Sequence, residues 1–166
     1  MNAYRIVHER ALHQSGGRPL ITQGATGRWN SQGVRITDLA EHPALAGLEM
    51  LNYVGPFRSV RGYQLYAVAI PETAIERAPE TLDVHDHAQT RPFGDAWVQS
   101  GHSLALLVPS AAAPHSFNVL LNQQHPDFLA LQPLPLGPSR EGRSAPGFIR
   151  GGVAAPARQG GKAEAP

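Results

Sequence analysis

The residues from Gly27 to Gly33 combine types that suit the binding of an anion. Arg28, Trp29 and Asn30 lie between the two glycines, which let the backbone approach a ligand closely where the chain turns. The guanidinium group of arginine is planar and permanently charged, and it binds pyrophosphate or carboxylate groups through paired hydrogen bonds. The same pattern also fits a hairpin turn in which Arg28 is exposed and Trp29 belongs to the core, so these residues alone leave both interpretations open.

Glu49 lies in an apolar segment, between Leu48 and Met50 and four residues after Leu45. A carboxylate against a buried surface is costly unless it is paired, so this position needs an explanation. Carboxyl groups in such surroundings are candidates for catalysis. The alternative is that a helix turns Glu49 onto a polar flank beside Asn52.

Ser110 directly follows an apolar run that Pro109 ends. A proline cannot continue the hydrogen-bonded ladder of a sheet, so we expect the hydroxyl at a sheet edge, just past the end of a strand, where ligands commonly bind. The sequence places no histidine to activate Ser110 as a nucleophile. We therefore interpret Ser110 as a hydrogen-bonding group, or else as a simple turn residue.

His85 and His87 flank Asp86 and could place two imidazoles on one side of a strand. A zinc site needs further ligands, and no residue provides one at a suitable spacing. The chain has no cysteine, which excludes disulfides, thiolate catalysis and cysteine-bound zinc. We predict a solvated loop at residues 85–87 and no bound metal.

The sequence also lacks the motifs of P-loop NTPases, Rossmann dehydrogenases and α/β-hydrolases.

The elements that must position these residues are mostly short strands. Apolar runs bounded by turn residues predict strands over residues 3–7, 63–70, 103–108 and 118–121. A helix is predicted over residues 41–54, with Asp38 as its candidate cap, and a second over residues 93–99, ended by Gly101. Strands that do not alternate regularly with helices favour an α+β fold of compact mixed or antiparallel sheets with few helices.

Composition limits the classes of protein to which the chain can belong. It has 166 residues, the size of one domain, and 42% of them are hydrophobic. The 14 basic and 13 acidic side chains give a net charge of +1, which provides no electrostatic reason for nucleic-acid binding. No apolar run is long enough to span a membrane, and the N-terminus does not resemble a signal peptide. We therefore expect a cytoplasmic protein.

The composition changes near residue 134. Residues 134–166 contain 5 prolines and 7 glycines. Such a segment cannot bury enough apolar area to offset the entropy lost on ordering. We predict a domain over residues 1–133 and a flexible tail over residues 134–166.

Arg28, Glu49 and Ser110, in this order and in these contexts, resemble the three residues after which the RES domain family is named. The matching segments run in family order across nearly all of residues 3–128. They are Tyr4-Arg5-Ile6, Gly27-Arg28-Trp29-Asn30-Ser31 with Gly33, Leu48-Glu49, Gly94-Asp95-Ala96-Trp97, Val108-Pro109-Ser110, and Asn118-Val119-Leu120-Leu121-Asn122 with His125-Pro126.

The resemblance implies a fold similar to that of ADP-ribosyltransferases and the activity of a growth-inhibiting bacterial toxin. Such toxins consume NAD⁺ by hydrolysis, phosphorolysis or ADP-ribosyl transfer, and their usual partner is a helix-turn-helix (Xre-type) antitoxin that covers the active site. The resemblance implies catalytic parts for Glu49, Arg28 and Ser110, which must then share one hollow. It implies NAD⁺ binding by Arg28, Arg5, Asn30 and Asn118.

One position departs from the family pattern. The family usually has a tyrosine about midway between its arginine and its glutamate, near the nucleotide, and a gapless reading places Asp38 there. The aspartate removes a stacking ring and adds a negative charge near the pyrophosphate. Three functions therefore stay open: NAD⁺ cleavage, ADP-ribosylation of a specific cellular protein, and a degenerate domain that binds a nucleotide or a partner without catalysis.

Overall fold

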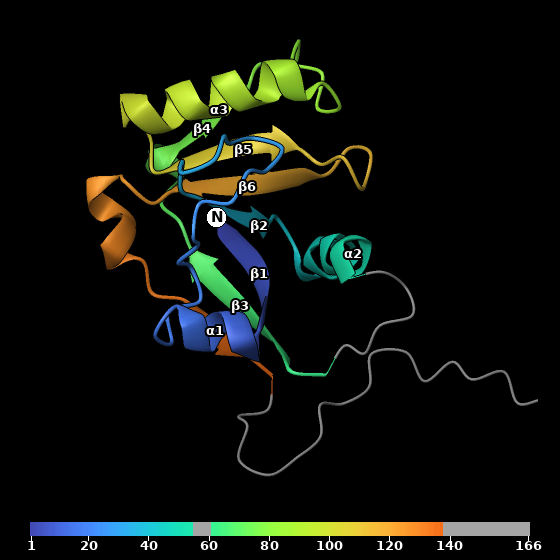
Figure 1. The fold of residues 1–166 in the computed structure, drawn as a ribbon, viewed down its shortest axis with the longest axis vertical. Helices are drawn as coiled ribbons and strands as arrows, with labels where there is room; N and C mark the ends of the chain where they lie inside the picture. Colours follow the sequence, from blue (N-terminus) through green and yellow to red (C-terminus); the bar gives the residue numbers. More distant parts are fainter. Residues whose placement is uncertain (55–60, 138–166) are drawn as a thin grey trace, which may run out of the picture.

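The structure is a computed structural model that describes residues 1–54 and 61–137. Figure 1 shows a sheet with α3 above its upper half and α2 beside its middle. The elements are β1 (Asn2–His8), α1 (Glu9–Gln14), β2 (Ile36–Ala40), α2 (Pro43–Val54), β3 (Tyr63–Ala69), β4 (Ile75–Arg77), α3 (His87–Ser100), β5 (Ala105–Pro109), β6 (Phe117–Asn122) and β7 (Leu134–Leu136), with short 3₁₀ helices at Glu72–Ala74 and Pro126–Ala130.

The seven strands form one sheet in the order β4-β5-β6-β2-β1-β3-β7. The β4–β5 pair is parallel and the other pairs are antiparallel. The predicted α+β fold of mixed strands with few helices is therefore confirmed. Within residues 1–54 and 61–137, no helix is long and apolar enough to cross a membrane.

The sheet diverges between β1 and β2. These neighbours are paired at one position, where Tyr4 lies opposite Ala40. By contrast, β1 pairs with β3 from Asn2 to His8, and β2 pairs with β6 along its whole length. The sheet therefore consists of two well-paired halves joined at one narrow junction, which we call the β1–β2 junction.

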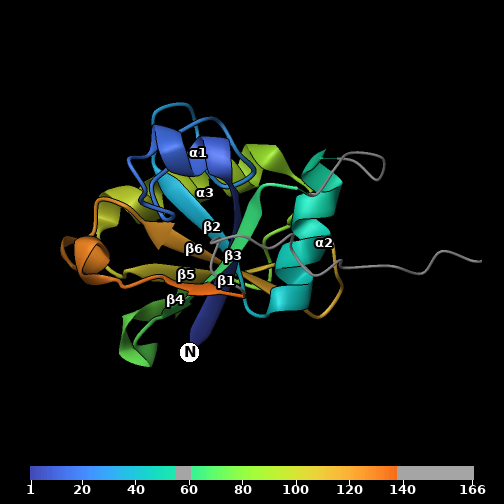
Figure 2. The ribbon, with the colours of Figure 1, turned by 90° about the horizontal axis from the view of Figure 1, so that it is seen from below.

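The two larger helices pack on different halves of the sheet. In α3, Trp97 and Val98 pack on Leu106 and Leu120 of β5 and β6. The apolar residues of α2 pack on the end of β2 and on β1 and β3, in a cluster of Leu45, Ala46, Ala40, Tyr4, Ile6 and Leu65. In both ribbon views α2 lies to one side of β1, β2 and β3 (Figures 1 and 2). Side chains from α2 therefore lie near the β1–β2 junction.

The four predicted strands are confirmed as β1, β3, β5 and β6, with ends that differ by one or two residues. Both predicted helices are also present, as α2 and α3. Helix α3 starts earlier than predicted, at His87, and it ends as predicted before Gly101, which has the left-handed φ of 62° that favours glycine.

Two local predictions are wrong. Asp38 does not cap α2 because it lies in the middle of β2; instead the backbone N–H of Leu45 donates to His42 Nδ1 at 3.3 Å. Residues 85–87 are not a loop throughout. Asp86 caps α3, its side chain accepting a hydrogen bond from Ala88, and His87 is the first residue of the helix.

The segment predicted as a tail begins within the sheet. Its first residues form β7, in which Leu134 and Leu136 lie opposite Ala67 and Leu65 of β3. Residues 138–166 lie outside the described part of the chain. The division into a domain over residues 1–133 and a flexible tail stays a prediction.

Candidate active site

Glu49 is held by two hydrogen bonds. Its Oε1 atom accepts one from Ser110 Oγ at 3.0 Å and one from Asn118 Nδ2 at 2.8 Å. Glu49 comes from α2, Ser110 directly follows β5 and Asn118 lies in β6. Three elements distant in the sequence thus meet at one carboxylate. We refer to Glu49, Ser110 and Asn118 as the Glu49 cluster.

Helix α2 brings Glu49 to this position because the helix is anchored one turn earlier. Leu45 packs against Ala40 at the end of β2, and Ala40 lies opposite Asn118 in the neighbouring strand. A side chain four residues along a helix lies on the same face, so Glu49 faces the sheet and not a polar flank. The side chain is half-buried, and its two hydrogen bonds offset the cost of that burial.

Two oxygen atoms of the Glu49 cluster have no hydrogen-bond partner among the described residues. Glu49 Oε2 accepts no hydrogen bond from the described residues, and Asn118 Oδ1 is buried without one in the same part of the chain. Nearly all buried polar atoms in folded proteins are hydrogen-bonded. The two free acceptors can therefore receive hydrogen bonds from a ligand with hydroxyl groups.

The Ser110 hydroxyl is fully engaged. It donates its one proton to Glu49, and it accepts hydrogen bonds from the backbone N–H groups of Ala112 at 3.0 Å and Ala113 at 3.3 Å. The side chain is buried. These contacts fit a group that positions Glu49, which is the hydrogen-bonding interpretation made from the sequence.

Arg5 and Asp38 flank the β1–β2 junction, one and two residues from the Tyr4–Ala40 pair. Desolvation raises the pKa of Asp38. The positive charge of Arg5 opposes this increase, and the negative charge of Glu49 adds to it. Because Asp38 is exposed, solvent limits the size of the shift. Burial lowers the pKa of Arg5, and its Nη1 atom is buried without a hydrogen-bond partner in the described structure.

Arg28 is held by the segment that leads into α3. Its Nη1 atom donates to the carbonyl oxygen of Val84 at 2.6 Å and lies 3.2 Å from His87 Nε2. On the other side of the same imidazole, Arg91 Nη2 lies 3.2 Å from Nδ1. Two guanidinium groups therefore approach one histidine ring. In the described residues, no group of three or more histidine, aspartate or glutamate side chains could hold a metal ion.

The backbone around Arg28 is also attached to α3. Thr90 Oγ1 donates to the carbonyl oxygen of Arg28 at 2.6 Å, and Arg91 Nε donates to that of Gly27 at 2.8 Å. Because these bonds use backbone carbonyls, they fix the path of the loop whatever side chain occupies position 28.

Gly94 and Asp95, one turn further along α3, also contact the loop that carries Arg28. A Cβ atom at Gly94 would lie 1.8 Å from the carbonyl oxygen of Trp29, so no other residue allows the loop to approach this closely. Asp95 Oδ1 then accepts a hydrogen bond from the backbone N–H of Ser31 at 2.9 Å. Trp29 is buried, as the hairpin interpretation of this loop also required.

Asn30 holds the loop together. Its side chain is buried, and its Nδ2 atom donates to the carbonyl oxygens of Ala25 and Val34, both at 2.8 Å. A side chain committed in this way shapes the loop that carries Arg28. These contacts favour a structural part for Asn30 over direct NAD⁺ binding.

Replacing Asn30 with alanine is therefore expected to destabilise the fold. The substitution leaves two carbonyl oxygens without their side-chain donor, which should lower the free energy of unfolding by about 1–3 kcal/mol. Urea denaturation followed by tryptophan fluorescence measures the change. The substitution Asn2→Ala, at an exposed residue, is the control. An unfolding free energy equal to that of the control would contradict this role.

The structure brings together some of the predicted site residues. Glu49, Ser110 and Asn118 are in contact, and Arg5 lies at the adjoining junction. Within residues 1–54 and 61–137, no hydrogen bond or ion pair joins Arg28 to any of these four. A ligand shared by Arg28 and the Glu49 cluster therefore stays a prediction.

The sequence offers Asp38 as a helix cap and, through the family resemblance, as a residue near the nucleotide; the structure places it in β2, where the charges of Arg5 and Glu49 act on it. A signal was present, because Asp38 is the single charged residue in the segment Ile36–Ala40. A single charged residue in an otherwise buried segment is typical of a strand with one accessible position.

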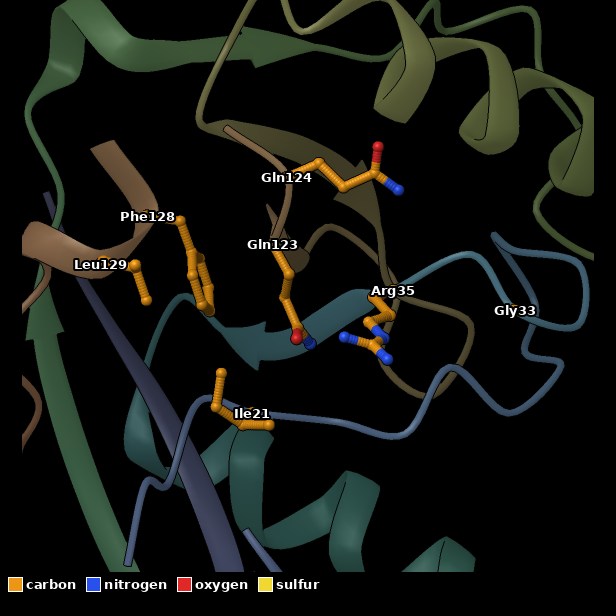
Figure 3. Close-up of a pocket in the computed structure, with 7 residues that line it drawn as sticks. All are labelled: Ile21, Gly33, Arg35, Gln123, Gln124, Phe128 and Leu129. Atoms are coloured by element: carbon orange, nitrogen blue, oxygen red, sulfur yellow. The ribbon is translucent and has the colours of Figure 1, made fainter. Parts of the chain in front are cut away.

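A separate hollow of about 450 Å³ lies near the opposite end of β2. Figure 3 shows Phe128, Gln123 and Arg35 pointing toward its interior. The other lining residues are Ile21, Gly33, Gln124 and Leu129. None of the lining residues carries a carboxylate, so we place the chemistry at the Glu49 cluster.

Comparisons with known proteins identify relatives of this chain. The family model described as "RES domain" matches residues 2–141. A "Toxin Res" of Yersinia enterocolitica is 33% identical over 135 residues, which cover 77% of this chain and 88% of the relative. A "Toxin Res" of Photorhabdus laumondii is 34% identical over 108 residues, covering 61% and 69%. A "Prs ADP-ribosylating toxin" of Sphingobium is 34% identical over 122 residues, covering 68% and 74%.

Proposed function

This chain belongs to the RES domain family, and on that premise we propose that it is a bacterial toxin that cleaves the nicotinamide–ribose bond of NAD⁺. The observation that carries the proposal is the Glu49 carboxylate, which two hydrogen bonds hold in place while Oε2 stays available. A fixed negative charge stabilises positive charge that develops beside it in a transition state. A relative named as an ADP-ribosylating toxin supports NAD⁺ as the substrate.

The chemistry requires little beyond such a carboxylate. When the bond between ribose C1′ and the nicotinamide nitrogen breaks, its electron pair stays on nitrogen and nicotinamide leaves as a neutral molecule. The ribose ring then carries the positive charge of an oxocarbenium-like state, as in glycoside hydrolysis. Glu49 is proposed to stabilise this charge and to accept a ribose hydroxyl. The nearby Asn118 Oδ1, which has no partner in the described structure, would accept a second hydroxyl.

The arginines supply the groups that bind phosphate. Arg28 is proposed to bind the pyrophosphate, since a guanidinium group forms paired hydrogen bonds with phosphate oxygens. Arg5 Nη1, which is buried without a partner in the described residues, provides a second donor beside the ribose. With both ends of the dinucleotide held, the reacting bond lies in a fixed orientation.

The proposal is tested by measuring nicotinamide release from NAD⁺ by the purified full-length chain, using liquid chromatography with and without phosphate. We expect one nicotinamide for each NAD⁺ lost. Free ADP-ribose would identify water as the acceptor, and its phosphorylated form would identify phosphate. Unchanged NAD⁺ at enzyme concentrations close to that of the substrate would overturn the proposal.

Replacing Ser110 with alanine should give a partial loss. The substitution removes one of the two hydrogen bonds to Glu49 Oε1 and leaves the one from Asn118. We expect kcat for nicotinamide release to fall by about tenfold, since one hydrogen bond to a charged group contributes about 1.5–3 kcal/mol. The control Ser100→Ala, at an exposed residue, should keep full activity. A kcat for Ser110→Ala within twofold of the control would contradict this role.

A second candidate is ADP-ribosylation of a cellular protein, which the name of the Sphingobium relative favours. The same bond breaks, but a protein side chain accepts the ADP-ribose. Incubation of the chain with cell lysate and NAD⁺ labelled in its adenylate part separates the two reactions. A labelled protein band supports transfer, whereas labelled ADP-ribose in solution supports hydrolysis.

We also propose that a helix-turn-helix antitoxin covers this site and that the toxin acts in the cytoplasm. Leu48, Leu51 and Tyr53 on α2 are exposed near Glu49, and Tyr53 exposes 89% of its surface. Exposed apolar groups of this kind are frequent in protein interfaces. If the neighbouring reading frame encodes a small helix-turn-helix protein, its co-expression should suppress NAD⁺ loss. Equal NAD⁺ loss with and without that protein would contradict the partner.

A further inference from the structure

Asp38 is the exposed residue of a strand that is otherwise buried. Its neighbours Thr37 and Leu39 are 0% and 3% exposed, and Ile36 and Ala40 are also buried. A carboxylate in the middle of a sheet is expensive unless a partner or solvent reaches it. Solvent reaches Asp38, and the same exposure leaves its carboxylate accessible to a ligand.

The strand register places Asp38 on the same face as the Glu49 cluster. Residues two apart in a strand point to the same face, so Asp38 shares a face with Ala40, at a distance of about 6.6 Å along the strand. Ala40 lies opposite Asn118 in β6, and Asn118 Nδ2 donates to Glu49 at 2.8 Å. The carboxyl groups of residues 38 and 49 thus approach the same part of the sheet from β2 and from α2.

The charged groups that act on Asp38 come from both sides of the β1–β2 junction. Desolvation raises the pKa of Asp38; the charge of Arg5 on β1 opposes this increase, and the charge of Glu49 on α2 adds to it. No ion pair within 4.0 Å joins Asp38 to Arg5 among the described residues. Asp38 is therefore not committed to a salt bridge, and it holds a proton more readily than an ordinary aspartate.

We propose that Asp38 is a second catalytic carboxylate, the general base that takes the proton from the acceptor during NAD⁺ cleavage. This inference depends on the proposed function. It assigns different tasks to two carboxylates: Glu49 stabilises the positive charge on the ribose, and Asp38 activates the attacking group. General bases with raised pKa values commonly have this task in enzymes.

The proposed step balances for hydrolysis. The oxygen of water forms a bond with ribose C1′ as the bond between C1′ and the nicotinamide nitrogen breaks, and that bond's electron pair leaves with neutral nicotinamide. One proton of the water passes to the Asp38 carboxylate and then to solvent. The products are ADP-ribose, nicotinamide and one proton.

The test compares Asp38→Asn with the unsubstituted chain in two reactions. Hydrolysis needs removal of a proton from water, so we expect kcat for nicotinamide release in phosphate-free buffer to fall by about 100-fold. Azide has no proton to lose, so in about 1 M azide the variant should form ADP-ribosyl azide and recover most of the nicotinamide release. Asp127→Asn, whose side chain is 73% exposed, is the control with full hydrolysis.

A stability measurement shows whether Asp38→Asn merely fails to fold. The pKa of Asp38 is raised in the folded chain, so the folded state binds more protons than the unfolded state above the ordinary carboxyl pKa of about 3.9. This group therefore costs the unsubstituted chain stability as pH rises through that window. The variant lacks the cost, and its melting temperature at pH 7 should equal or exceed that of the unsubstituted chain.

Each outcome bears on the proposal. A folded Asp38→Asn variant with slow hydrolysis and restored release in azide supports it. Hydrolysis within threefold of the unsubstituted chain overturns the role of Asp38 and leaves the proposed function intact. Loss of the azide reaction as well also overturns it, because Asp38 would then be needed before proton removal. If the unsubstituted chain releases no nicotinamide, the proposed function fails and this inference fails with it.

Discussion

Replacing Glu49 with glutamine is expected to lower kcat for nicotinamide release by about 10²–10³-fold. The substitution keeps the shape of the side chain, and the amide oxygen can still accept the hydrogen bonds that Ser110 and Asn118 donate to Oε1. What is lost is the negative charge beside the ribose. Because this charge matters most in the transition state, kcat should change far more than KM.

Glu80→Gln is the matched control for this prediction, since Glu80 is exposed. The two variants should have the same circular dichroism spectrum and melting temperatures within a few degrees of each other. A Glu49→Gln protein that folds and releases nicotinamide at the rate of Glu80→Gln would show that this carboxylate does not stabilise the transition state.

Replacing Arg28 with alanine is expected to lower kcat/KM by about 10³-fold, mainly through a higher KM. The loss of a charged partner from a desolvated charge pair costs about 2–5 kcal/mol, and each 1.4 kcal/mol is a factor of ten. The loop itself should survive, because Thr90 and Arg91 hold the backbone of residues 27 and 28 rather than the guanidinium group. Isothermal titration with ADP-ribose measures the same loss as weaker binding.

Arg18→Ala serves as the control, because Arg18 is exposed. It removes the same charge from the chain and should leave KM unchanged. If Arg28→Ala binds ADP-ribose as tightly as Arg18→Ala does, Arg28 does not bind the pyrophosphate, and its task is limited to its contacts with Val84 and His87.

The sequence predicts the parts of the fold in which local pattern and burial agree. In β5, residues 105–108 are apolar and buried. The apolar run that forms β3 stops shortly before Pro71. Both strands can therefore be predicted from composition. The C-terminus of α3 follows from Gly101, whose positive φ an ordinary residue rarely adopts. These elements can be predicted because residues close together in the sequence determine them.

Other features depend on contacts between distant residues, and the sequence does not predict them. Strand β2 is short and carries Asp38 in its centre, so its apolar residues give a weak signal until β6 is paired beside it. The same pairing places Asp38 within a strand, so Asp38 is not a helix cap. Helix α3 starts at His87 because Asp86 caps it, and His87 in turn contacts Arg28, 59 positions away in the sequence.

The candidate site shows the same division. The positions of Glu49 and Ser110 and the family resemblance predict both as site residues, and the structure joins them at 3.0 Å. It could not be predicted that Asn118 donates to the same oxygen or that Arg5 and Asp38 flank one junction of the sheet. Those relationships arise from strand register, which the chain fixes only on folding.

A crystal structure of the Glu49→Gln variant with NAD⁺ tests the central claim most directly, because the slow variant retains the intact dinucleotide. Our account predicts that ribose C1′ lies beside the side chain of residue 49, with the ribose hydroxyls near Asn118 and the pyrophosphate on Arg28. A dinucleotide bound in the hollow lined by Arg35 and Phe128, or held by Arg28 with its ribose away from residue 49, would contradict the account.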